Sequence, residues 1–509
     1  MTLSSKPPSS VRRRIVRFAL FSALIVGGLL SARILFVFRD RHPNHSVLLD
    51  IPGRNPSQPS QPLRAGFARL KINPDVSNPR KPVWLAGFSQ NRAATKIHDD
   101  LWAVAIVIDD GQSRLGLVAL DAIGFFHDDV IEVRRSLSKI ARLTYAIVCS
   151  THNHSTPDLM GLWGPHPLKS GVNPAYRLQV IAAAAKALEE ATANLQPAEF
   201  SSHEIELKPD GLQTDTRKPR VFDPNLRFLH FKNPTNNATL GSLVGWANHP
   251  ETVWSGDTEI TADFPGTLRD ALESGIHDAS GTKMDGLGGI HVFVNGAVGG
   301  LMTTHPSVTV PDPYQALAYT KPSHEKTRAL GQSLAKHILT RLKTTNAPSL
   351  SSAPLSIRAR TIQIRLDNPG FLIAPVLGLI DRGHQRWNHI RTETALITLG
   401  NVSFACIPGE IYPELVNGGM EQAPGGDFGI PPLEVPPIRE LMPGQIKFVL
   451  GLANDAIGYI IPKSEWDRRP PFLYGAQKAP YGEVNSVGPE TAQILHRTLS
   501  EMCRAATSN

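Results

Sequence analysis

The sequence predicts a mixed α/β protein: one large domain built on a mixed β-sheet with flanking helices, preceded by an N-terminal membrane segment. Three observations support this fold class. Short apolar runs rich in β-branched residues, typical of buried strands, are interspersed with longer runs that have helical spacing. The two kinds of run do not alternate strictly, and no repeat of fixed period occurs. The chain has 509 residues, 41% of them hydrophobic, which is enough for a large globular core.

The first 39 residues have the charge pattern of a membrane segment. They contain seven basic residues and no acidic ones, and the apolar run over 18–38 carries a charge only at Arg33. A basic cluster before such a run is typical of an anchor or of an export signal. We favour an uncleaved anchor, because the run resumes past Arg33 and Leu30-Ser31-Ala32 is a poor cleavage site. The remaining chain is then expected outside the cytoplasm, or secreted or periplasmic if the segment is cleaved.

The net charge of +7 comes from this segment, since the remaining 45 basic residues equal the 45 acidic ones. A neutral body gives no reason to expect a nucleic-acid partner, and we expect none. The three cysteines, Cys149, Cys406 and Cys503, provide no disulfide framework. The stability of the body must therefore come from its core.

Residues 40–64 are rich in Pro, Ser and Gln, which predicts a linker, and residues 65–509 are expected to form the folded domain. Apolar, β-branched runs predict strands, two of them joined by the hairpin turn Asp109-Asp110-Gly111. These strands are expected near 65–72, 103–108, 114–120, 145–150, 227–231, 240–247, 290–294, 355–366, 394–406, 448–452 and 457–461. Helical spacing, with Asn173-Pro174 as one start signal, predicts helices at 127–142, 173–195, 264–273, 323–343 and 491–504.

Four residues share one context, a β run that breaks into a turn: His152, His249, Glu410 and Tyr459. Two imidazoles and a carboxylate make three ligands, the usual number at a catalytic zinc that keeps a position for water. Such a water titrates near ~7 and can attack an acyl carbon. Chemistry alone places Tyr459 beside the metal or in the substrate pocket. The alternative for a bare His-x-His is a pair of surface histidines.

His154 follows His152 by two residues, so both side chains leave the strand end on the same side. Beside a metal, His154 can hold a developing oxyanion or carry a proton. Asp121 and Asp263 are candidates either for orienting the histidines or for capping loops.

Ten short motifs occur in the order found in the neutral (non-lysosomal) ceramidase family, which the chain resembles over about residues 64–500. They are Ala65-Gly66-Phe67 with Ile72-Asn73-Pro74, Leu85-Ala86-Gly87-Phe88, His98-Asp99-Asp100-Leu101, Thr151-His152-Asn153-His154-Ser155-Thr156-Pro157, Asn248-His249-Pro250, Asp263-Phe264-Pro265-Gly266, Asn295-Gly-Ala-Val-Gly299, Pro408-Gly409-Glu410, Gly458-Tyr459 and Tyr481-Gly482-Glu483.

The resemblance implies a zinc-dependent amidohydrolase that cleaves the N-acyl amide bond of ceramide, a lipid substrate. It implies four Zn²⁺ ligands, which carry over to His152, His249, Glu410 and Tyr459. His154 and Tyr481 would contact the scissile amide and are the expected catalytic residues.

The resemblance also implies two substrate-binding positions. Arg217 corresponds to a family arginine by a poor local match. A family serine near the amide falls at Gly300, which supplies no hydroxyl.

Two alternatives stay open. One is a zinc hydrolase of the same fold that acts on a different amide or ester, such as another N-acyl lipid. The other is a membrane-tethered binding protein that keeps the fold without catalysis, although such a protein has no physical need for four metal-binding side chains.

Overall fold

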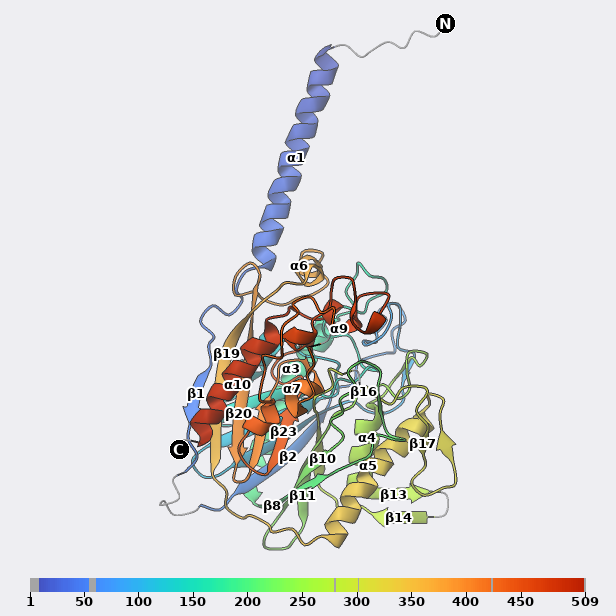
Figure 1. Ribbon diagram of the computed structural model, residues 1–509, viewed down its shortest axis with the longest axis vertical. Helices are drawn as coiled ribbons and strands as arrows, with labels where there is room; N and C mark the ends of the chain where they lie inside the picture. Colours follow the sequence, from blue (N-terminus) through green and yellow to red (C-terminus); the bar gives the residue numbers. More distant parts are fainter. Residues whose placement is uncertain (1–8, 55–60, 279–280, 301, 423, 508–509) are drawn as a thin grey trace.

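The computed structural model describes residues 9–54, 61–278, 281–300, 302–422 and 424–507 (Figure 1). The mixed α/β class predicted from the sequence is confirmed. The strands do not form one large sheet: they are divided among three larger sheets that share a core, together with several two-stranded ones.

The first sheet has the strand order β6-β5-β4-β2-β7. Its members are β2 (Arg64–Lys71), β4 (Trp102–Asp109), β5 (Arg114–Leu120), β6 (Tyr145–Ser150) and β7 (Gln196–Pro197). The pair β5–β6 is parallel and the others are antiparallel. Alternate residues of β4 face opposite sides: Val104 and Ile106 enter the shared core, while Ala103 and Ala105 pack under α2 (His127–Ser136) and α3 (Pro174–Ala193).

The second sheet has the order β15-β11-β10-β8. Its strands are β8 (Glu199–Ile205), β10 (Leu226–Lys232), β11 (Thr239–Trp246) and β15 (Ile290–Asn295), and only β11–β15 is parallel. Leu243 and Val292 face the shared core. Val244 and Phe293 pack on the other face against α4 (Asp263–Ser274) and α5 (His324–Thr344).

The third sheet has the order β1-β19-β20-β21-β23. It contains β1 (Leu48–Ile51), β19 (Leu355–Arg365), β20 (His389–Leu399), β21 (Val402–Cys406) and β23 (Ile446–Leu450), with β21–β23 parallel. Its outer face is covered by α10 (Thr491–Thr507), and Figure 1 shows this helix lying across β19 and β20.

Shorter elements fill the connections between the sheets. The strands are β3 (Lys96–Ile97), β9 (Thr214–Asp215), β12 (Glu259–Ile260), β13 (Gly275–Asp278), β14 (Gly281–Asp285), β16 (Met302–Thr303), β17 (Val310–Pro311), β18 (Ala318–Tyr319), β22 (Glu410–Ile411) and β24 (Tyr459–Ile460). The helices are α6 (Pro369–Val376), α7 (Pro413–Asn417), α8 (Ile438–Leu441) and α9 (Tyr481–Val484).

Helix α1 (Ser9–Val37) stands away from the body in Figure 1. Its segment Arg13–Val37 is long and apolar enough to cross a membrane, with a mean hydropathy of 2.1, and almost all of it is exposed. Residues 1–8 of the predicted membrane segment lie outside the described residues.

The expectation of a free linker over 40–64 needs correction. Asp40 forms a two-pronged ion pair with Arg391, and Leu48–Ile51 pairs with β19 as the edge strand of the third sheet. Residues 40–51 are therefore part of the fold, because the backbone pairing with β19 and the partly buried Asp40–Arg391 ion pair hold them to the body. Residues 55–60 of the expected linker lie outside the described residues.

The topology places several strand ends together. Strands β6, β11, β15 and β21 each belong to a parallel pair, and the chain leaves their carboxyl ends toward one region between the sheets. The candidate ligands predicted from the sequence follow three of these ends, and β22 pairs in parallel with β24 to bring Glu410 beside Tyr459.

Candidate metal centre

His152 sits directly beyond β6, and its imidazole is fixed by the backbone. Its Nδ1 atom donates to the carbonyl of Ile123 at 2.7 Å, which leaves the Nε2 lone pair facing the interior. The residue has φ +67°, a left-handed conformation that is strained for a side chain other than glycine. Its backbone N–H donates to the carbonyl of Ala122. Neighbouring backbone groups thus hold the strained turn that aims this ring.

His249, beyond β11, is fixed in the same way. Its Nδ1 atom donates to the carbonyl of Met302 at 2.8 Å, and its Nε2 atom lies 3.3 Å from Oε2 of Glu410. The same carboxylate oxygen lies 3.2 Å from Nε2 of His152. Two bare imidazole nitrogens and one carboxylate oxygen therefore converge on one point, the arrangement expected of ligands around a divalent cation.

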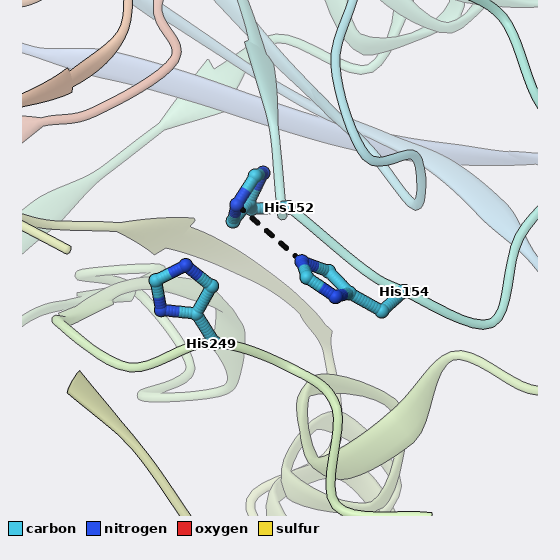
Figure 2. Close-up of side chains that lie close together, drawn as sticks. All are labelled: His152, His154 and His249. Carbon is cyan, nitrogen blue, oxygen red and sulfur yellow. Dashed lines mark hydrogen bonds between the residues drawn. The ribbon is translucent and has the colours of Figure 1, made fainter. Parts of the chain in front are cut away.

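His152, His154 and His249 surround a common point, and their candidate ligand atoms lie within 4.8 Å of one another (Figure 2). The Nε2 atoms of His152 and His154 are 3.5 Å apart. All three side chains are buried. This group can hold a metal ion. The alternative that His152 and His154 are surface histidines is wrong, because both side chains are buried.

Glu410 and Tyr459 are neighbours across the β22–β24 pair. Burial alone would raise the pKa of Glu410, but His152 and His249 outweigh it and hold the pKa well below its usual value. Burial, with the charge and hydrogen bond of Glu410 beside it, raises the pKa of Tyr459 well above its ordinary value. Glu410 is thus a carboxylate, and the Tyr459 hydroxyl is held against it.

The two histidine-bearing loops are joined by Asn295, at the end of β15. Its side-chain amide donates to the carbonyls of Thr151 at 3.0 Å and Asn248 at 2.9 Å. Its side-chain oxygen accepts from the backbone N–H groups of Asn248 and Gly296. The last residue of β15 thus positions the residues that precede His152 and His249.

Glu251 is a site residue that the sequence analysis missed. Its Oε2 atom lies 3.1 Å from Nδ1 of His154, and both side chains are buried. Burial would raise the pKa of Glu251, but the neighbouring His154 and His249 lower it. Burial lowers the pKa of His154 to about 4, against the raising effect of Glu251. In the sequence, only its position two residues after His249 indicated that Glu251 could belong to the site.

Gly87 provides the space for the His154 ring. A Cβ atom at this position would lie 2.5 Å from Cγ of His154, and the backbone there has φ +104°. Both facts require glycine. Gly87 also lines the cavity next to the histidines.

A cavity opens beside this centre. Its polar lining consists of His152, His154, Glu410, Tyr459 and Tyr481 at the metal centre, together with Arg382, His384 and Asn485. The remaining wall is largely apolar and includes Ile123, Phe126, Met160, Leu162, Trp163, Leu366, Phe371, Pro375, Ile380, Ile390, Leu452, Ala456, Ile457 and Val487. A concave apolar wall with a few convergent polar groups is typical of a small-molecule site.

Tyr481 lies at the edge of this cavity, with 59% of its surface exposed and its ring 5.8 Å from that of Tyr459. Burial of its hydroxyl, with Glu410 and Glu251 nearby, raises the pKa of Tyr481 to about 12. The residue also lines a second cavity. It therefore stands between the two cavities, within reach of a ligand at the metal centre.

The structure does not bring Arg217 to the cavity that holds the histidines. Its guanidinium forms an ion pair with Glu414 and stacks over the ring of Tyr412 at 4.0 Å. It lines the second cavity. The predicted contact of Arg217 with substrate stays a prediction, and the position of this residue assigns that contact to the second cavity.

Gly300 also lies outside the lining of the first cavity. A Cβ atom there would lie 3.0 Å from the ring of Pro413 and 3.4 Å from Asp215, so a serine would need its neighbours to move.

Neither Asp121 nor Asp263 orients a histidine. Asp121 forms a buried two-pronged ion pair with Arg269 at 2.7 and 2.9 Å. Asp263 accepts the backbone N–H groups of Thr252 and Phe264. Both carboxylates stabilise the fold around the site, and backbone carbonyls orient the two imidazoles.

Two solved structures resemble this chain. One is a crystal structure of neutral ceramidase from Pseudomonas aeruginosa, 17% identical, with a TM-score of 0.64 over 89% of this chain and 75% of that one. The other is a ceramidase complexed with C2, 16% identical, with a TM-score of 0.65 over 88% and 75%. No family model and no curated protein matches the sequence. The chain has the neutral ceramidase fold, as the motifs in its sequence predicted.

Proposed function

We propose that this protein is a zinc-dependent amidohydrolase that cleaves the N-acyl amide bond of ceramide or a related N-acyl lipid. The observation that carries the proposal is the position of the buried imidazoles and Glu410 beside a cavity with a largely apolar lining. An apolar wall suits an acyl chain, and the donor set beside it suits the ion that activates water. The shared fold with ceramidase structures supports the same substrate class.

His152, His249 and Glu410 are the proposed zinc ligands, with Tyr459 as the fourth. The donor chemistry fits: two imidazole Nε2 atoms and one ionised carboxylate face one point, and both Nδ1 atoms are occupied by carbonyls. When bound, zinc supplies a Lewis acid for the acyl oxygen and lowers the pKa of water to about 7.

His154 is the proposed proton carrier. Its Nδ1 atom faces the Glu251 carboxylate, so the proton of the neutral ring sits on Nδ1 and the Nε2 lone pair points toward the reacting atoms. Nε2 accepts the proton of the attacking water, and Glu251 stabilises the imidazolium that results. The same Nε2 then donates that proton to the leaving amine nitrogen. The hydroxyl of Tyr481 donates a hydrogen bond to the substrate at the edge of the cavity.

A different amide or ester is the second candidate substrate. Gly300 supplies no hydroxyl, and Arg217 is occupied by Glu414 outside the cavity. Both features differ from the substrate contacts that the sequence resemblance implied. They favour a substrate whose polar group is bound by other residues at the same metal centre.

Helix α1 is proposed to anchor the protein in a membrane, with the body outside the cytoplasm. The basic residues Arg13, Arg14 and Arg17 precede its apolar part. Because basic flanks stay on the cytoplasmic side of a membrane helix, this charge distribution favours an amino terminus in the cytoplasm. The alternative is that the segment is cleaved and the body is released.

A substrate panel with the zinc-loaded protein tests the proposed function. Fatty-acid release is measured from ceramide, from other N-acyl lipids and from acyl esters, with His152→Ala as the inactive control. Release from ceramide that disappears in His152→Ala is expected. Preferential release from another N-acyl compound selects the second candidate. A protein that releases nothing from any substrate and contains no stoichiometric zinc is the inactive binding protein.

A further inference from the structure

The membrane-spanning candidate α1 ends directly against α6. The guanidinium of Arg33 donates to the carbonyls of Pro375 and Val376, the last residues of α6, at 3.3 and 3.2 Å. A cation at the carboxyl end of a helix satisfies its free carbonyls and complements its dipole. In Figure 1 α6 lies at the base of α1, on the end of the body from which α1 projects.

The same region forms one wall of the cavity. Phe371 and Pro375 of α6 line it, together with His384. Phe38, one residue beyond α1, packs edge-on against His384 with ring centroids 4.6 Å apart. The end of α1 is therefore separated from the cavity by single side chains.

The outer surface of this wall is apolar and exposed. Ile373 and Leu377 of the α6 region are 55% and 51% exposed, and Trp387, which contacts Phe38 at 4.4 Å, is 53% exposed. We call Ile373, Leu377 and Trp387 the rim. Large apolar side chains that gather next to a buried apolar cavity mark an interaction surface, and tryptophan is enriched where proteins meet lipid headgroups.

The length of α1 sets the level of the rim relative to a bilayer. Arg17 and Arg33 mark the two charged ends of its apolar part, and the helix between them is roughly 24 Å long at 1.5 Å per residue. With their long side chains extended toward the headgroups, the two arginines span about 30 Å, the thickness of the hydrocarbon core. Because Arg33 contacts α6, the rim lies at the outer headgroup level.

We propose that the rim is seated in the outer leaflet of the bilayer that α1 spans, and that the cavity receives its lipid substrate laterally from that leaflet beneath α6. The occupant of the rim is thus a lipid bilayer, since the contacts of Arg33 with α6 and of Phe38 with Trp387 place the rim directly at the end of the apolar helix α1. The lateral path rests on the proposed function, whereas seating of the rim in lipid does not.

A fluorescent reporter tests the seating of the rim without measuring activity. Cys149, Cys406 and Cys503 are all buried, so a cysteine introduced at an exposed position is labelled selectively. Ile373→Cys and the control Leu317→Cys each receive an environment-sensitive dye. Leu317 is 54% exposed and precedes β18, whose partner β17 lies well away from α6 in Figure 1.

The full-length variants are placed singly in phosphatidylcholine nanodiscs that contain lipids with nitroxide groups near the headgroup. We expect blue-shifted emission and at least twofold quenching for Ile373→Cys, and neither effect for Leu317→Cys. Equal emission and quenching at the two positions overturn the proposal. A blue shift for Ile373→Cys that persists without lipid, and occurs only when a second protein molecule is present, would show that the rim is a self-association surface. That result also overturns the proposal.

Hydrolysis tests the lateral path. The double variant Ile373→Asn with Leu377→Asn is compared with Leu317→Asn on a long-chain ceramide embedded in the same nanodisc and on a short-chain, water-soluble one. A five- to tenfold slower reaction of the double variant on the embedded substrate alone is expected. Equal losses on both substrates, or none, overturn the lateral path. Absence of hydrolysis by the wild-type protein instead refutes the proposed function and with it the lateral path, while the dye still decides whether the rim meets lipid.

Discussion

The Nδ1 atom of His154 lies 3.1 Å from Oε2 of Glu251, and this buried pair stands directly beside the point on which His152, His249 and Glu410 converge. A carboxylate behind a histidine fixes the position of the ring proton and stabilises the imidazolium. The pair distinguishes His154 from the two histidines whose Nδ1 atoms face carbonyls, and it is the basis of its proposed role in proton transfer.

Replacing Glu251 by glutamine separates this role from metal binding. We expect Glu251→Gln to keep its zinc and to lower kcat by about 10- to 100-fold, the range for the loss of a contact that supports a functional histidine. Zinc content and kcat are measured together, with Glu190→Gln on the exposed face of α3 as the control. Loss of zinc at unchanged folding would show that Glu251 supports the metal instead, and unchanged kcat would remove it from the mechanism.

A methyl group at Gly87 is predicted to displace the His154 ring. In Gly87→Ala the new Cβ would lie 2.5 Å from the ring, at φ +104°. We expect at least a tenfold loss of kcat with one zinc retained. Gly256→Ala is the matched control, because no atom lies within 4 Å of a Cβ there and the backbone is not in the left-handed region. Similar kinetics of the two variants would contradict the placement of His154.

Asn295 is predicted to be the main structural tie between the two histidine loops. Its four hydrogen bonds are buried, and Asn295→Ala leaves two carbonyls and two N–H groups without partners. At 1–3 kcal/mol for an unsatisfied buried group, partly relieved by relaxation, we expect a loss of about 3 kcal/mol in the free energy of unfolding. Urea denaturation measures it, and the exposed turn residue Asn236 provides the control Asn236→Ala. A loss no greater than that of the control would assign the loop geometry to other contacts.

Stability in acid is predicted to depend on Asp223. Burial alone would raise its pKa, but Arg439 at 2.9 Å and Arg227 at 3.3 Å lower the pKa to about 2. A carboxyl whose pKa is lower in the folded protein stabilises it fully above the unfolded pKa, and this contribution is lost as pH falls toward the folded one.

Asp223→Asn should therefore cost about 3–5 kcal/mol at pH 7, as expected for breaking a buried ion pair. The difference from wild type should shrink by roughly 2 kcal/mol between about pH 4 and pH 2. Urea denaturation of both proteins at several pH values measures it. A difference that is independent of pH would show that the pair is not ionised as described.

The helices and strands that hold the site were predicted well from the sequence, whereas their long-range contacts were predicted poorly. Helices α3, α4, α5 and α10 lie where helical spacing placed them, because this spacing is a local property. Candidate ligands could be recognised because they follow apolar strands directly. Whether His152, His249, Glu410 and Tyr459 are zinc ligands stays a prediction.

The features that the sequence did not show depend on distant partners. Arg217 pairs with Glu414, almost two hundred residues away, and no local pattern indicates that pair. The strand β1 has only four residues in a segment of loop-like composition, and its pairing with β19 decides its structure. Glu251 is a lone carboxylate until the fold brings it to His154.

The central claim is that one zinc ion binds where His152, His249 and Glu410 converge. Anomalous diffraction from a crystal of the purified, zinc-loaded protein, collected at the zinc absorption edge, tests it most directly. The account predicts one strong peak about 2.0–2.2 Å from Nε2 of both histidines and from a carboxylate oxygen of Glu410. No peak at that point, or a peak held by other residues while these three side chains contact each other without metal, would contradict it.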